Sequence, residues 1–78
     1  MKTAIRTPWI TLEALLKFAG IVESGGRAKE LIKEGSVKVD GVVVTERGRK
    51  IRPGMTISLR GLPENVEVTA AGGRDGES

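Results

Sequence analysis

Cysteine and histidine are absent from the sequence. Their absence excludes disulfides, thiolate nucleophiles, histidine-centred catalytic triads and the thiolate or imidazole ligands of most zinc sites. Only carboxylates and lysines remain for enzyme chemistry, and an enzyme built from them would need a group of perturbed pKa in a pocket, which a sequence does not reveal. We therefore expect a non-enzymatic protein with no catalytic residue, no metal site and no cofactor.

Long apolar runs and aromatic side chains are also scarce. No apolar stretch approaches the roughly 18 residues that span a membrane, and Glu13 and Lys17 interrupt the one candidate signal sequence, residues 9–22. We therefore expect a cytoplasmic protein without membrane contact. The only aromatic residues are Trp9 and Phe18. We expect Phe18 to pack near a helix hairpin and Trp9 to cover the core, so a nucleic acid would be bound through its phosphates and shape.

The 78 residues suffice for one domain, and their charge is distributed unevenly. Residues 1–60 contain twelve bases and six acids, whereas residues 61–78 contain one base and four acids. A basic body with an acidic end predicts a polyanionic partner for the body. A charged surface that only maintains solubility explains these counts equally well.

A helix hairpin is predicted in the first half of the chain. Apolar residues at i, i+3, i+4 and i+7 predict a helix between Thr11 and Gly20, capped by the Thr11 hydroxyl and ended by the glycine in a left-handed conformation. A second helix is predicted from about Gly25 to Glu34, with Ser24 as its cap. Its apolar stripe is narrow and must pack on the first helix; it consists of Ala28, Leu31 and Ile32.

Strands are predicted after Gly35, where the apolar period changes from 3.6 to 2. Asp40-Gly41 between valine-rich runs predicts a hairpin with a type I′ turn, and Pro53-Gly54 fits the centre of a type II turn. Residues 45–52 are expected to form a polar, basic loop. Further strands are predicted around Ile5, over residues 55–59 and, at an edge of the sheet, around Val66 and Val68.

The second helix is sorted by charge. On a helical wheel, Lys29 and Lys33 fall on one flank of the apolar stripe, and Arg27 falls on the other with two glutamates. Solvated positions with weak i,i+3 pairs, worth ~0.2–0.5 kcal/mol each, explain this sorting without a partner. Free amides at the start of the helix, beside Ser24 and Arg27, can hold one phosphate. Equally, the pair Gly25-Gly26 can serve only to permit a tight turn into the helix.

The stronger signal is the run Arg47-Gly48-Arg49-Lys50-Ile51-Arg52. Its four cations repel one another, since no acid stands among them. An arginine fork matches phosphate oxygens bidentately, and glycine lets a sugar-phosphate backbone approach closely. Because three of the four cations are arginine, where lysine would serve solubility as well, a phosphate contact is favoured over a mobile loop without a partner.

Residues 23–59 resemble the small RNA-binding domain named after ribosomal protein S4, also called the αL motif, in its free-standing bacterial form. The family pattern stands here as Ser24, Ala28-Lys29-Glu30-Leu31-Ile32, residues 35–41 and Pro53-Gly54. The resemblance covers roughly residues 10–60. This sequence departs from the pattern at three positions, where Gly25 replaces an arginine that contacts RNA, Asp40 replaces an asparagine, and Met55 replaces an aspartate that supplies a turn hydrogen bond.

The resemblance implies an α+β fold in which a helix hairpin packs on a small, mainly antiparallel β-sheet. Residues 1–70 would form the one domain and residues 71–78 a disordered polar tail. It also implies a monomeric module without a small-molecule substrate, which binds structured RNA, either ribosomal RNA or a ribosome-assembly intermediate. The RNA would lie in a basic groove; the residues implied to bind it are Ser24, Gly26, Arg27, Lys29, Lys33, Lys38, Arg47, Arg49, Lys50 and Arg52.

In that groove Arg27, Lys29, Lys33 and Lys38 would stand on one side, facing the run 47–50 on the other, with Arg52 next to the turn. The alternative function is a protein-interaction module whose basic face docks onto an acidic protein partner or onto the acidic tail of this chain.

Overall fold

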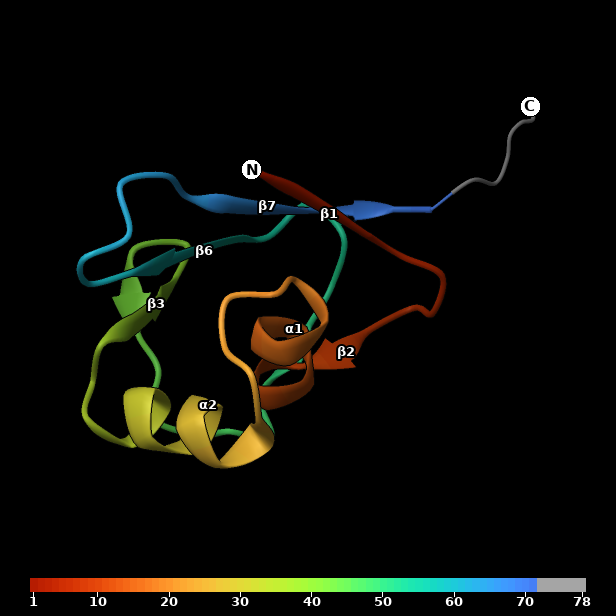
Figure 1. Cartoon of the computed structure of the whole chain (residues 1–78). Coiled ribbons are helices and arrows are strands. Elements are labelled where there is room, and N and C mark those ends of the chain that lie inside the picture. The colour runs from red at the N-terminus through yellow and green to blue at the C-terminus, as the bar shows by residue number, and fades with distance from the viewer. Residues whose placement is uncertain (72–78) are drawn as a thin grey trace.

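The computed structural model describes residues 1–71, so the tail expected to be disordered lies outside the described residues except for Ala71. Two helices and seven short strands follow one another within residues 1–71 (Figure 1). In order, they are β1 (Lys2–Ile5), β2 (Ile10–Thr11), α1 (Leu12–Phe18), α2 (Gly25–Lys33), β3 (Val37–Val39), β4 (Val42–Val43), β5 (Lys50–Ile51), β6 (Thr56–Leu59) and β7 (Val66–Ala70).

The strands form a five-stranded sheet in the order β1-β7-β6-β3-β4 and a two-stranded ribbon of β2 and β5. Every pair is antiparallel except β1 with β7. Both helices lie on the same side of the large sheet (Figure 1). The predicted helix hairpin on a mainly antiparallel sheet is thus confirmed. Neither helix within residues 1–71 is long and apolar enough to cross a membrane.

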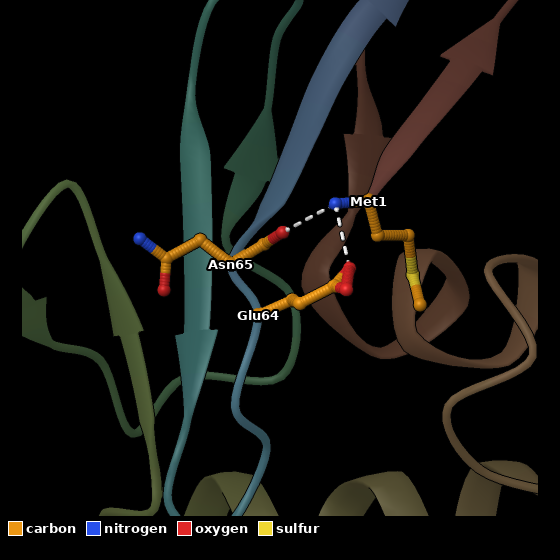
Figure 2. Close-up of polar contacts among 3 residues, drawn as sticks. All are labelled: Met1, Glu64 and Asn65. Carbon is orange, nitrogen blue, oxygen red and sulfur yellow. Dashed lines mark hydrogen bonds and ion pairs between the residues drawn. The ribbon is translucent and has the colours of Figure 1, made fainter.

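The prediction that the strand around Val66 and Val68 forms an edge is wrong, because β1 pairs alongside it. The parallel register runs from Lys2 opposite Glu67 to Ile5 opposite Ala70. The start of β1 is also held by the amino group of Met1, which donates to the Asn65 carbonyl at 3.1 Å and pairs with Glu64 at 3.3 Å (Figure 2). Strand β7 is therefore an interior strand, with both of its neighbours hydrogen-bonded.

Both predicted helix caps are present. The Thr11 hydroxyl accepts a hydrogen bond from the amide of Ala14, and the Ser24 hydroxyl accepts one from the amide of Arg27, each at 3.2 Å. These bonds satisfy first-turn amides that have no partner within the helix. Gly20 follows α1 with a φ of +76°, the left-handed conformation that the sequence pattern predicts there.

The two predicted turns also form. Asp40 and Gly41 have φ values of +50° and +85°, as a type I′ turn requires, and the Asp40 carboxylate accepts from the amide of Thr56 at 2.9 Å. Gly54 has a φ of +100°, and the amide of Met55 donates to the Arg52 carbonyl at 3.1 Å. The turn hydrogen bond expected to be lost at Met55 is replaced, since its sulfur accepts from the amide of Arg52 at 3.4 Å.

The core lies between the helices and the large sheet. It takes side chains from both helices, from β3, β6 and β7, and from the ribbon. Its fully buried large side chains are Leu12, Leu15, Leu16, Ile32, Val37, Ile51, Ile57, Val66 and Val68. The prediction that residues 45–52 form one basic loop is thus partly wrong. Lys50 and Ile51 form strand β5, because the isoleucine side chain is buried in the core.

Neither aromatic side chain belongs to this core. Phe18 is 62% exposed because it stands two residues beyond Leu16 on α1, which places it on the opposite face of the helix. Trp9 is 40% exposed because its neighbour Ile10 packs against the core, and successive side chains of an extended segment point to opposite sides.

Candidate nucleic-acid interface

A groove of about 910 Å³ lies between α2 and residues 45–52, which we call the basic segment. Lys29, Ile32 and Lys33 line the helix side of this basic groove, and seven residues of the basic segment line the rest. Among the ten lining residues the only acid is Glu46, whereas six are cations: Lys29, Lys33, Arg47, Arg49, Lys50 and Arg52.

The helix side of the groove is positioned by the apolar stripe of α2. Ile32 is almost completely buried, and Lys29 and Lys33 stand one turn apart beside it with exposed side chains. Because Ala28 and Ile32 fix the rotation of the helix against the core, the two ammonium groups face the basic segment. The two lysines that the helical wheel places on one flank of α2 therefore line one side of the groove.

The basic segment is held by backbone hydrogen bonds to the start of α1. The amide of Leu12 donates to the carbonyl of Arg49 at 2.8 Å, and the amide of Glu13 donates to the carbonyl of Arg47 at 3.1 Å. These are two of the amides that a helix leaves unpaired at its first turn. Together with the buried Ile51 they fix the backbone of the segment, so its cations are carried on an ordered wall.

Two of the six cations have acidic partners. Arg47 lies 3.6 Å from a Glu13 oxygen, and Arg49 lies 3.5 Å from a Glu46 oxygen. Both arginines are more than half exposed, and exposed pairs of this kind contribute only about 0–1 kcal/mol. Within residues 1–71 the other four groove cations have no ion-pair partner, so the groove keeps an excess of positive charge.

Gly25 lies close to the side chain of Glu13. A Cβ built on Gly25 would lie 2.9 Å from the Glu13 carboxylate, which also pairs with Arg47. A Cβ on Gly26 would meet only the Ser24 hydroxyl, at 3.9 Å. For Gly25 the geometry therefore favours a tight turn into the helix over a phosphate cradle, and an arginine there would displace Glu13.

The remaining predicted site residues do not line the basic groove. Ser24 and Arg27 line a hollow of about 520 Å³ on the other flank of α2, which we call the leucine hollow; it also contains Leu31, Leu59, Arg60 and Leu62. The Ser24 hydroxyl is used as a cap, and Arg27 pairs with Glu30 at 3.2 Å. Gly26 is exposed at the start of α2.

Lys38 lies on the outer face of the sheet, opposite Ser58 in the β3–β6 register. It shares a small hollow there with Arg60, whose amide donates to the Ser36 carbonyl at 2.9 Å. Six of the ten residues predicted to bind RNA thus meet in the basic groove. Lys38, which was predicted to stand on one side of that groove, lies elsewhere. The sequence analysis did not consider Arg60, which lies beside Lys38 in this hollow. Its position two residues after Ser58, at the end of a predicted strand, indicated that the two side chains share a face.

Among residues 1–71, no group of three or more acidic side chains gathers in a way that could hold a metal ion. The basic groove gathers six cations, and such a concentration of positive charge can attract and hold an anionic chain.

Comparison with known proteins identifies the family. A family model described as the S4 domain matches residues 3–69. The chain belongs to the S4 domain family. The S4 domain is an RNA-binding domain and not itself a catalytic one, although it also occurs within enzymes such as synthases. The predicted resemblance is therefore confirmed over more of the chain than expected.

Two relatives match this chain over most of their own length. "Putative RNA-binding protein YbcJ" of Escherichia coli (strain K12) is 48% identical over 63 residues, covering 81% of this chain and 87% of that protein. The solution structure of YbcJ, described as an αL motif involved in RNA binding, matches with a TM-score of 0.68 and 43% identity over 88% of this chain and 86% of that chain. "Probable ribosome maturation protein RlbA" of Bacillus subtilis (strain 168) is 38% identical over 59 residues, covering 76% of this chain and 83% of that protein.

A third relative is an enzyme, and the match covers only a small part of it. Ribosomal large subunit pseudouridine synthase B of Bacillus subtilis (strain 168) is 47% identical over 51 residues, which are 65% of this chain and only 20% of the enzyme. The similarity is thus confined to a fifth of that protein.

Proposed function

We propose that this protein is a non-enzymatic module that binds structured RNA in the basic groove, and that the RNA is ribosomal RNA or a ribosome-assembly intermediate. The observation that carries the proposal is the meeting of six cations from α2 and the basic segment in one groove, four of them without an acidic partner within residues 1–71. The ribosomal part is supported by the names of two relatives, RlbA and pseudouridine synthase B.

The mechanism of binding is neutralisation of phosphates on an ordered scaffold. Lys29 and Lys33 contact one stretch of the RNA backbone from the helix, and the arginines of the basic segment contact the facing stretch. The spacing of the two walls gives selectivity for shape. The protein acts as a monomer in the cytoplasm, and residues 1–70 are its single functional domain.

Salt dependence tests this mechanism directly. The protein is titrated against an RNA hairpin and a DNA duplex of matched length, with fluorescence anisotropy as the readout at several salt concentrations. Engagement of five or six phosphates gives a slope of log affinity against log salt of roughly −4 to −5, by counterion release. We expect tighter binding to the RNA. Equal or absent binding to both would contradict the proposal and would favour an acidic protein as the partner.

Arg49→Glu assigns the binding to the basic segment. The substitution reverses one groove cation and places it beside Glu46, so affinity for the RNA hairpin should fall by about tenfold or more, as expected for a lost charge-assisted contact. The fold should persist, because the backbone carbonyl of residue 49 still accepts from Leu12. Thermal unfolding shows whether the variant is as stable as the parent protein. If its unfolding temperature is unchanged and it still binds the RNA hairpin as tightly as the parent, the basic segment is not the interface.

A further inference from the structure

Trp9 lies on the same face of the β2–β5 ribbon as two cations of the basic groove. The ribbon pairs Ile10 with Ile51, and Ile51 is completely buried. Continued by one residue, this antiparallel register sets Trp9 opposite Arg52. Because side chains alternate along each strand, Trp9, Lys50 and Arg52 point away from the core together.

The tryptophan ring is exposed and already in contact with a groove residue. Trp9 is 40% exposed, and the ammonium nitrogen of Lys50 lies 4.9 Å from the centre of its ring. Lys50 and Arg52 both line the basic groove, so the ring stands beside a residue of the groove. The Thr7 hydroxyl donates to the carbonyl of Trp9 at 2.7 Å, which holds the backbone that carries the ring.

An exposed indole beside a row of cations is suited to a nucleobase. Every base has a flat π-face that stacks on an aromatic ring, and a neighbouring cation strengthens the contact. A base inside a continuous helix is not available to Trp9, since its neighbours cover both of its faces. The largest π-face belongs to a purine.

We propose that Trp9 is a base-stacking platform that takes an unpaired purine of the RNA whose phosphates occupy the basic groove. This inference rests on the proposed function and narrows its target to a helical region interrupted by an unpaired nucleotide. Lys50 then contacts the ring and the phosphate next to the stacked base.

Phe18 provides a matched control within the same chain. It is 62% exposed and is the only other aromatic residue. It lines a different hollow, together with Ala4, Ile5 and Ile10, and contributes nothing to the basic groove. A general effect of an exposed aromatic side chain on RNA binding would therefore appear at both positions, whereas stacking beside the groove residue Lys50 would appear only at Trp9.

The test compares two blunt-ended RNA duplexes of equal stem length, one fully paired and one with a single bulged adenosine. Because Trp9 is the only tryptophan, intrinsic fluorescence reports on its ring alone. We expect the bulged duplex to quench the emission on binding and to bind about tenfold more tightly than the paired one. Trp9→Ala should abolish that preference, Trp9→Phe should retain part of it, and Phe18→Ala should retain all of it.

The possible failures are distinguishable. Equal affinity for the two duplexes with unchanged emission, and with the steep salt dependence still present, would overturn the stacking platform and leave the proposed function standing. An equal loss of affinity for both duplexes in Trp9→Ala would also overturn it, because Trp9 would then act only by positioning Lys50. Absence of RNA binding by the parent would overturn both proposals. Thermal unfolding of each variant shows that the fold is retained.

Discussion

The two flanks of α2 both carry cations and hollows, yet they are different kinds of surface. On one flank Lys29 and Lys33 face the basic segment across the basic groove. On the other, Arg27 is paired with Glu30, and the leucine hollow beside it contains three partly buried leucines. The function of a cation on this helix therefore depends on which residues the fold places opposite it.

The flanks also differ in how they are held. The basic segment is fixed by two backbone hydrogen bonds to α1 and by Ile51, which is completely buried. The leucine hollow is formed by side chains at the margin of the core, including Leu31 and Leu59. A truncation on the groove flank should therefore cost more stability than a similar truncation on the other flank.

The largest expected effect is on stability, from Ile51→Ala. Removing this buried side chain leaves a cavity under the basic segment and should lower the free energy of unfolding by about 2–4 kcal/mol. Leu31→Ala on the opposite flank should cost only about 1–2 kcal/mol, since that side chain is partly exposed. Urea unfolding followed by circular dichroism measures both. Equal losses would show that the two flanks are anchored equally well.

The helix hairpin and the two turns could be predicted from sequence because each depends on residues close together in the chain. The Thr11 and Ser24 hydroxyls cap their helices by accepting from amides only three residues further on, and Asp40-Gly41 forms its turn from its own two φ angles. The ribbon could not be predicted in this way. Strands of two residues give no periodicity, and Ile51 pairs with Ile10, which lies some forty positions earlier in the chain.

The same reasoning explains what was missed at the site. A helical wheel separates Lys29 and Lys33 from Arg27, but it does not say which flank meets the basic segment. The positions of Trp9 and Lys38 depend on strand register, which is a long-range property. The resemblance to the S4 domain supplied the residues of the site as a set. The packing of α2 separates Arg27 from the groove cations, and the strand register places Lys38 on the outer face of the sheet.

A double charge reversal on each flank tests the division in RNA binding. Lys29→Glu with Arg52→Glu removes from the basic groove two cations that have no ion-pair partner within residues 1–71. It should weaken binding to the RNA hairpin about 100-fold, which corresponds to about 2.7 kcal/mol. Arg27→Glu with Arg60→Glu changes the net charge by the same amount on the other flank and should weaken binding less than about threefold, through long-range repulsion alone.

The readout is fluorescence anisotropy at one fixed salt concentration, after circular dichroism shows that both double variants are folded. Because the two variants carry the same net charge, any difference between them reports on position. Similar losses of affinity would mean that the RNA contacts both flanks, and the interface would then include Arg27 and Arg60.

The smallest expected effect comes from Gly25→Ala, which tests whether Glu13 belongs to the groove flank as a partner of Arg47. The new methyl group would displace the Glu13 carboxylate, the flexible end of its side chain, and break its contact with Arg47. Loss of that exposed pair costs up to about 1 kcal/mol, and alanine gains a similar amount over glycine in a helix. Stability should therefore change by less than about 0.5 kcal/mol, whereas Gly54→Ala, at a φ of +100°, should lose about 1 kcal/mol or more.

RNA affinity in Gly25→Ala gives the sharper answer. Arg47 without its acidic partner is free to contact a phosphate, so affinity for the RNA hairpin should rise slightly, by about twofold at most, as expected for an exposed ion pair of small net strength. Anisotropy titrations of the parent and the variant at low salt measure this difference. A fall in affinity would mean that Glu13 orients Arg47 toward the RNA instead of competing with it, and the acid would then count as part of the groove wall.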